Sequence, residues 1–173
     1  CPAGEVYGCD GSCGAPSSTP CSGIVLPPPE PGPACFSGDT PITMADGSQK
    51  PIKTVKAGDL VLAFDTETSS RVPARVLHTI RRIQPMYIIV NNSLRVTPRH
   101  RFYLSGRWIA VESLKPGDEL FTVLGERSAI RSVQRRKGNL TVYNLTVENF
   151  HNYYAGGFLV HNAKPDIAFI FLD

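Results

Sequence analysis

The chain has 173 residues, of which 42% are hydrophobic and 19% are charged, and this composition suits one globular domain of about 100–150 residues with an appended segment. The net charge is only +3, and no nucleic-acid-binding motif gathers the basic residues, so a nucleic-acid partner is not expected. No apolar run reaches the roughly 18 residues that a membrane-spanning helix needs, so no membrane partner is expected either.

Residues 1–34 differ in composition from the rest of the chain. They contain eight Pro and six Gly, and they carry three acidic residues but no basic ones. Such a segment buries little apolar surface and favours extended backbone. We therefore expect a disordered Pro/Gly/Cys-rich leader, which leaves 18 basic and 12 acidic residues in the remainder.

The five cysteines are unevenly distributed. Four lie in the leader, where they could form two disulfides in the oxidising compartment of a secreted or cell-surface host protein, or ligate a metal: Cys1, Cys9, Cys13 and Cys21. The fifth, Cys35, is a candidate reactive thiol, but counting alone equally allows a buried thiol or a disulfide partner for one of the four. We place the start of the globular domain at Cys35.

From Cys35 onward, short β-branched or aliphatic runs alternate with Gly/Asp turn signals, which is typical of an all-β domain. No stretch keeps a helical period for more than two turns, and residues 110–114 are the one candidate for a helix. The expected strands cover residues 40–43, 49–55, 60–65, 71–82, 86–90, 94–97, 101–104, 129–133 and 142–147.

An internal repeat divides this region into two β units. Three pairs of segments match: 56–62 with 115–121, 86–90 with 142–147, and 94–100 with 158–162. Both copies of the first pair contain Lys-x-Gly-Asp. Two similar units in tandem predict a pseudo-twofold arrangement, in which the ends that carry His100 and His161-Asn162 face each other across the axis.

Four short motifs follow one another in the domain. They are Cys35-Phe36-Ser37-Gly38-Asp39-Thr40, Thr97-Pro98-Arg99-His100, Val142-Tyr143-Asn144-Leu145-Thr146-Val147 with His151, and Phe158-Leu159-Val160-His161-Asn162. In this order they resemble the splicing blocks of Hint domains, the family of inteins, Hedgehog autoprocessing modules and bacterial intein-like domains.

The resemblance implies an all-β Hint-type horseshoe of two pseudo-twofold related β units. It spans residues 35–162, between the leader, 1–34, and a C-terminal flank, 163–173. Inteins have Cys, Ser or Thr directly after the terminal Asn, whereas this chain has Ala163. The pair His161-Asn162 followed by Ala is most similar to a bacterial intein-like domain.

By this resemblance the domain is a single-turnover, self-acting enzyme that cleaves its own flanks without a cofactor. Cys35 attacks the carbonyl of Ala34 and converts the amide to a thioester. His100, an imidazole that ordinarily titrates near neutral pH, protonates the departing nitrogen. Thr97 orients His100 or donates to the tetrahedral oxyanion. Many family members have Asp where Asn144 stands, so Asn144 departs from the pattern that tunes the nucleophile.

At the other end, the side-chain amide of Asn162 closes on its own carbonyl, forming a succinimide and releasing Ala163. His161 polarises that carbonyl or protonates the leaving nitrogen, and His151 activates the amide. Because Ala163 has no nucleophilic side chain, the thioester is resolved by water, by an external thiol or amine, or by the freed amine of Ala163. We therefore expect cleavage at both junctions, with at most inefficient splicing, by a monomer.

Other interpretations stay open. Thr97 and His100 could form an ordinary strand-ending turn, His151 could bind a backbone carbonyl, and Asn162 could be a turn residue. The domain could instead transfer its leader to an external nucleophile, as Hedgehog modules do, or be an inert β-rich extracellular module. A zinc ion could act as an inhibitor by binding to Cys35, His100, His151 and His161.

Overall fold

The computed structural model describes Val6–Tyr7, Cys13–Gly14 and residues 34–162. The chain divides into two units, Cys1–Glu30 and Pro31–Asp173. In the first unit, strands β1 (Val6–Tyr7) and β2 (Cys13–Gly14) pair antiparallel. The predicted leader disulfides and the C-terminal flank with Ala163 lie outside the described residues.

Strands make up nearly all the regular structure of residues 34–162, and the expected all-β fold is confirmed. Two 3-10 turns, η1 (Ile52–Thr54) and η2 (Val111–Ser113), are the helical segments of this part of the chain. No helix among the described residues is long and apolar enough to cross a membrane. The strands are β3 (Phe36–Ser37), β4 (Pro41–Thr43), β5 (Gln49–Pro51), β6 (Leu60–Asp65), β7 (Ser70–Val90), β8 (Leu94–Val96), β9 (Arg101–Leu104), β10 (Arg107–Ala110), β11 (Glu119–Phe121), β12 (Arg127–Ala129), β13 (Val133–Val147), β14 (Asn152–Ala155) and β15 (Phe158–His161).

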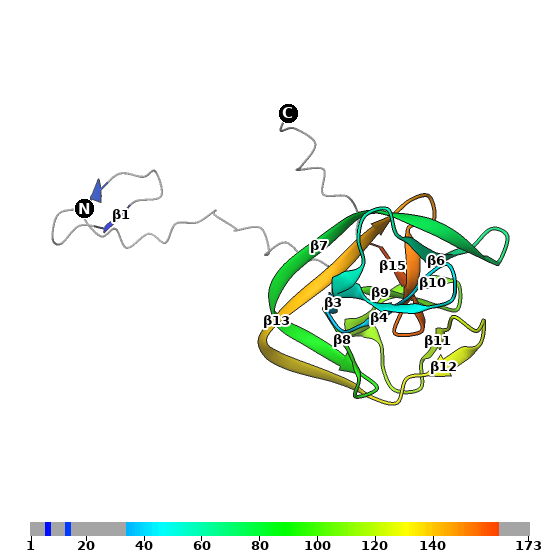
Figure 1. Cartoon of the computed structure of the whole chain (residues 1–173). Helices are drawn as coiled ribbons and strands as arrows, with labels where there is room; N and C mark the ends of the chain where they lie inside the picture. The colour runs from blue at the N-terminus through cyan, green and yellow to red at the C-terminus, as the bar shows by residue number, and fades with distance from the viewer. Residues whose placement is uncertain (1–5, 8–12, 15–33, 163–173) are drawn as a thin grey trace. The chain divides into compact units, whose positions relative to one another are not determined.

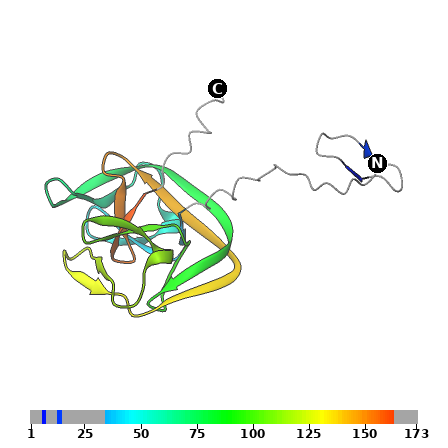
Figure 2. The same cartoon turned by 180° about the vertical axis from the view of Figure 1, so that it is seen from behind.

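Two sheets enclose the core. One has the order β10-β9-β15-β14-β4-β5, and the other has the order β13-β3-β8-β7-β6. Because β13 also pairs with β7, four strands of the second sheet close a ring. Figures 1 and 2 show β7 and β13 running side by side as a long curved ribbon. The buried side chains inside form one cluster that includes Phe36, Ile42, Ile88, Phe102 and Val160.

Strand β7 differs from the expectation of two strands, 71–82 and 86–90, because it runs unbroken from Ser70 to Val90. The proline between the two predicted strands, Pro85, has no N–H and falls at a bulge: Gln84 pairs with Leu140 and Met86 with Lys137. The irregularity removes the need for a ladder hydrogen bond at Pro85, so pairing with β13 continues past it.

The strand expected over residues 129–133 is not formed, because β12 ends at Ala129 and β13 begins at Val133. A second strand and the helix candidate are shorter than expected. The strand expected over residues 49–55 ends at Pro51, where the chain enters the 3-10 turn η1. The helix candidate over residues 110–114 is the single 3-10 turn η2. In both cases the next residue, Val55 or Leu114, returns to extended backbone and is buried in the core. Core packing therefore sets the end of each element.

The Lys-x-Gly-Asp repeat forms the same turn twice. A carboxylate oxygen of Asp59 accepts the backbone N–H of the lysine three residues earlier at 3.0 Å, and Asp118 does the same at 3.0 Å. Gly58 and Gly117 have φ values of +93° and +96°, which glycine adopts without a steric cost. The two β units are therefore related as the sequence predicts.

The turn at residues 37–40 is also repeated, at residues 97–100. In each turn the last residue, Thr40 or His100, donates its N–H to the carbonyl of the first, at 3.0 and 3.1 Å. The carbonyl of the same residue accepts the N–H of the first residue of the following 3-10 turn. Thr40 accepts from Ile52 at 2.9 Å, and His100 accepts from Val111 at 2.8 Å. The expected match of 94–100 with β15 is therefore wrong, because β15 pairs with β14 and β9 and occupies no equivalent place.

Candidate active site

The peptide bond between Ala34 and Cys35 is held on both sides by side chains. The backbone N–H of Cys35 donates to Thr97 Oγ1 at 2.7 Å, and the carbonyl of Cys35 accepts from the backbone N–H of Thr97 at 2.8 Å. The amide nitrogen of Asn144 donates to the carbonyl oxygen of Ala34. The nitrogen of this peptide bond thus contacts Thr97, which lies just after β8, and the oxygen contacts Asn144 on β13.

Asn144 is buried on β13, and its side-chain oxygen accepts two hydrogen bonds. The hydroxyl of Tyr153 donates at 2.6 Å and the backbone N–H of Leu145 at 2.7 Å. Two donors on Oδ1 assign the other amide atom, Nδ2, to the side that faces Ala34. The predicted departure from Asp to Asn at this position therefore provides a donor that an ionised carboxylate lacks.

The thiol of Cys35 is fully buried. Burial raises the pKa of Cys35 to about 12, although the positive charge of Arg82 opposes this shift. A thiol with this pKa keeps its proton at neutral pH, so it needs a base close by before it can act as a nucleophile.

His100 is fully buried with its ring against Phe36, the two ring centroids 4.1 Å apart. Burial lowers the pKa of His100 to about 3, and the nearby backbones of His161 and Ala34 only partly oppose this shift. Within residues 34–162, no group makes a hydrogen bond of standard geometry to either ring nitrogen. The ring is therefore neutral at neutral pH, unlike the expected imidazole that titrates there.

Asn162 is buried at the end of β15. Its side-chain amide donates to the carbonyl of Val147 at 3.2 Å, and its backbone N–H donates to the carbonyl of His151 at 2.9 Å. Nδ1 of His161 lies 2.9 Å from the carbonyl oxygen of Asn162. The His161 ring stands edge-on to Trp108, with the centroids 5.0 Å apart. At this end too, a side-chain nitrogen lies beside the carbonyl of the predicted junction.

His151 is exposed, at a positive φ of 55°, just before β14. Within the described residues, its hydrogen bond to Asn162 is made by the backbone carbonyl. The next residue, Asn152, exchanges two hydrogen bonds with the backbone of Phe64, both 2.8 Å long, and so ties β14 to β6. No role was predicted for Asn152 or Tyr153, although they are the two residues that follow His151.

The backbones of Ala34 and His161, which come from opposite ends of the domain, both lie near His100. The backbones of both Ala34 and His161 affect the pKa of His100, so the expected closeness of His100 and His161 is found, although the repeat does not explain it. Among the described residues, no three His, Cys, Asp or Glu side chains could hold a metal ion. The described residues therefore form no zinc site from Cys35, His100, His151 and His161.

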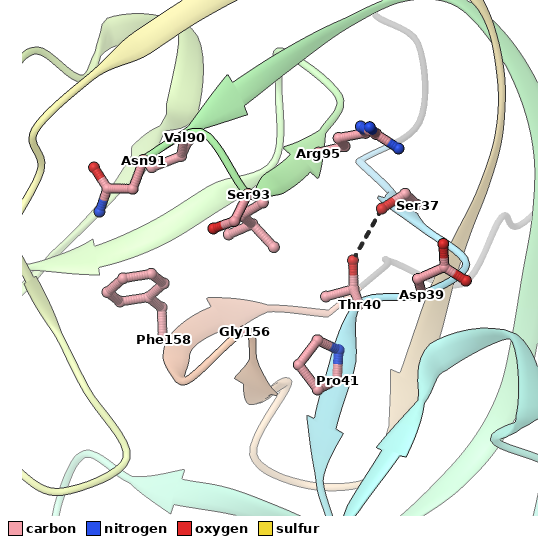
Figure 3. A pocket seen from close by; sticks show the side chains of 11 residues that line it. Ser37, Asp39, Thr40, Pro41, Val90, Asn91, Ser93, Arg95, Gly156 and Phe158 are labelled. Atoms are coloured by element: carbon pink, nitrogen blue, oxygen red, sulfur yellow. Dashed lines mark hydrogen bonds between the residues drawn. The ribbon is translucent and has the colours of Figure 1, made fainter.

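A separate cavity of about 490 Å³ opens between the β3–β4 segment, the turn after β7 and the turn after β14 (Figure 3). The hydroxyls of Ser37 and Thr40 lie 3.3 Å apart in its wall, in the turn that corresponds to residues 97–100. Gly156 in the same wall corresponds to His161, since β14 pairs with β4 as β15 pairs with β9. Thr40 and Gly156 thus occupy the places that His100 and His161 occupy in the other β unit, and their smaller size leaves this cavity open. The cavity is therefore the pseudo-twofold counterpart of the junction region.

Solved structures that resemble this fold include an intein-like domain and inteins. The solution structure of a bacterial intein-like domain from Clostridium thermocellum superposes with a TM-score of 0.68 at 28% identity, covering 74% of this chain and 98% of that one. A DnaB intein from Synechocystis sp. PCC 6803 has a TM-score of 0.64 at 22% identity, covering 76% and 99%, and shows the fold alone. Fold and motifs together define an intein-like Hint domain, a class of self-processing domains.

Family and sequence comparisons agree with this class. The model of the Pretoxin HINT domain matches residues 42–163, and the chain belongs to that family. The chain is 36% identical over 92 residues to replicative DNA helicase DnaB of Rhodothermus marinus, covering 50% of this chain and 10% of that protein. It is 28% identical over 116 residues to Tiggy-winkle hedgehog protein of Danio rerio, covering 57% and 27%. The chain thus spans under a third of the length of these relatives.

Proposed function

We propose that this domain cuts its own backbone at two junctions, Ala34–Cys35 and Asn162–Ala163, and needs no cofactor. One observation supports the proposal most strongly: the carbonyl oxygen at each junction lies beside a side-chain nitrogen, Nδ2 of Asn144 at the first and Nδ1 of His161 at the second. Donors at these places stabilise the negative charge that develops on the oxygen when a nucleophile attacks the carbonyl carbon.

In the first step, the sulfur of Cys35 bonds to the carbonyl carbon of Ala34, and the carbon–nitrogen bond breaks. The products are a thioester and the free α-amine of Cys35. The thiol proton moves by way of the His100 ring to that nitrogen as the carbon–nitrogen bond breaks, so that no separate imidazolium forms on a ring whose pKa burial lowers to about 3. Thr97 accepts from the Cys35 N–H, so its role is to hold the nitrogen in place and not to stabilise the oxyanion. Asn144 donates to the oxyanion.

In the second step, Nδ2 of Asn162 bonds to the carbonyl carbon of the same residue, and the bond to Ala163 breaks. A succinimide forms, and one amide proton ends on the nitrogen of Ala163. The side-chain amide must first leave the carbonyl of Val147. His161, with its proton on Nδ1, donates to the carbonyl oxygen, and His151 takes the amide proton.

The residue after the second junction determines the product. Ala163 has no side chain that could capture the acyl group, so the thioester is resolved by water, thiol or amine. Separate flanks are the main products, with little ligation. The likeness to Tiggy-winkle hedgehog protein favours one rival, transfer of the upstream segment to an external nucleophile. An adduct on the carboxyl end of Ala34 in the released fragment would reveal that transfer.

A time course of intact mass for the full chain tests the proposal. Cys35→Ala is expected to abolish cleavage after Ala34 and to preserve cleavage after Asn162, and Asn162→Ala is expected to do the reverse. Asn139→Ala, at an exposed bulge residue of β13, is the matched control and leaves both rates unchanged. Cleavage after Ala34 that persists in Cys35→Ala, or cleavage after Asn162 that persists in Asn162→Ala, contradicts the assignment. A wild-type chain that stays intact with thiol at neutral pH would be an inert module.

A further inference from the structure

Tyr153 is a fully buried tyrosine on β14 that contacts the first junction through another side chain. Its hydroxyl donates to Oδ1 of Asn144 at 2.6 Å, and Nδ2 of Asn144 donates to the carbonyl oxygen of Ala34. We infer that Tyr153 is a positioning residue for thioester formation, acting through Asn144. The inference rests on the proposed function of the Ala34–Cys35 junction.

The carboxamide of Asn144 can in principle adopt two orientations about its last torsion. In the flipped orientation its oxygen would face the oxygen of Ala34, and the donor to the oxyanion would be lost. The Leu145 N–H, which also binds Oδ1 at 2.7 Å, belongs to the adjacent residue on the same strand. Tyr153 comes from a different strand, so its bond fixes the amide relative to the packed core.

The hydrogen-bond chain strengthens as the reaction proceeds. When negative charge grows on the oxygen of Ala34, the N–H groups of Asn144 are polarised, and the amide oxygen becomes a better acceptor for Tyr153. Burial raises the pKa of Tyr153 well above its usual value, and Cys35, when ionised, raises it further. The hydroxyl therefore keeps its proton and remains a donor at any pH at which the domain works.

The neighbouring Tyr154 offers a matched comparison. It is also fully buried on β14, but its hydroxyl has no hydrogen-bond partner among the described residues. Successive residues of a strand point to opposite faces, so the two hydroxyls lie on opposite faces of β14. Removing the Tyr154 hydroxyl therefore changes the core by one oxygen atom without touching the junction.

The test measures thiol-induced release of residues 1–34 from the full chain by intact mass. Tyr153→Phe is expected to slow release about tenfold, which lies between the roughly fivefold effect of one neutral hydrogen bond and the 10²–10³-fold effect of a lost oxyanion donor. Cleavage after Asn162 in the same sample keeps its wild-type rate. Tyr154→Phe keeps both rates.

A second pair of variants separates positioning from a general structural role. Asn144→Ala is expected to slow release by about 10²–10³-fold, and adding Tyr153→Phe to it is expected to slow release no further, because the two side chains act as one unit. A Tyr153→Phe rate equal to wild type, or an equal slowing with and without Asn144, overturns the inference. If Cys35→Ala still releases residues 1–34, the proposed function itself has failed.

Discussion

Two side chains contact the Ala34–Cys35 bond, and residue chemistry explains which atom each of them contacts. The hydroxyl oxygen of Thr97 accepts the N–H of Cys35 and so contacts the nitrogen of this bond, although the motif alone also allowed a contact with the oxyanion. An asparagine amide supplies N–H donors, so Asn144 serves the oxygen. Asn at a position where the resemblance leads one to expect Asp is thus an exchange of an acceptor for a donor.

Buried His100 predicts a loss of stability in acid. Its pKa is lowered from 6.5 to about 3 in the folded domain, so between these pH values the unfolded chain binds a proton that the folded chain does not. The folded domain therefore has its full stability with respect to this group above pH 6.5, and it loses stability as the pH falls toward 3. The free energy of unfolding is expected to drop by about 2 kcal/mol between pH 7 and pH 5.

Urea unfolding measures this drop in a full chain in which Cys35→Ala and Asn162→Ala prevent cleavage. In this background His100→Leu, which keeps an apolar contact with Phe36, is expected to flatten the pH dependence between pH 7 and 5. His78→Gln at an exposed position is the matched control and leaves the dependence intact. An equal drop in the His100→Leu variant would show that other groups cause it.

Local chemistry determines which strands the sequence predicts well. Residues 60–65 and 101–104 are predicted to the residue, because turn signals flank both runs. Strand β7 is not, because its passage through Pro85 depends on a bulge in its partner β13. Likewise the Lys-x-Gly-Asp repeat is found from sequence because its hydrogen bonds are local. The false match of residues 94–100 with β15 arises because a short similarity does not encode strand pairing.

In the candidate site, too, features with a local sequence signal are predicted and features that depend on strand packing are not. The motifs name the residues at both junctions, since the chemistry requires particular residue types near particular peptide bonds. The link from Tyr153 to Asn144 joins two strands, β14 and β13, and depends on how they pack. The two hydrogen bonds between Asn152 and Phe64 join residues that are 88 positions apart in the sequence, so no local pattern predicts them.

The two Lys-x-Gly-Asp turns predict equal responses to one substitution. Gly58→Ala and Gly117→Ala should each lower the free energy of unfolding by about 1–2 kcal/mol, because both φ values are positive and an L-residue is strained there. A methyl group at either position would meet nothing within 4 Å, so strain is the main cost. Urea unfolding of the cleavage-blocked chain measures it.

An asparagine control separates backbone strain from other effects at these turns. Gly58→Asn is expected to cost less than Gly58→Ala, because Asn enters the left-handed region more readily than Ala. The same order is expected at Gly117. A cost at only one of the two turns would contradict their structural equivalence.

The fold brings together segments that lie at opposite ends of the domain. Strand β13 contributes the Asn144 amide to the carbonyl of Ala34, and three residues later the Val147 carbonyl receives the amide of Asn162. The buried ring of His100 lies near the backbones of Ala34 and His161. A thioester at one junction and a new nucleophile at the other would therefore form in the same region.

Ala163→Cys is consequently expected to convert much of the cleavage into ligation. Its thiol can accept the acyl group from Cys35, giving a branched chain, and cyclisation of Asn162 then releases the joined flanks. Intact mass spectrometry should show residues 1–34 joined to residues 163–173 as a main product, where the wild type gives mostly separate pieces. Adding Asn162→Ala should make the branched chain accumulate, because its release requires the succinimide. If both cleavages proceed in the Ala163→Cys chain while no joined product forms, the two junctions do not come within reach of each other.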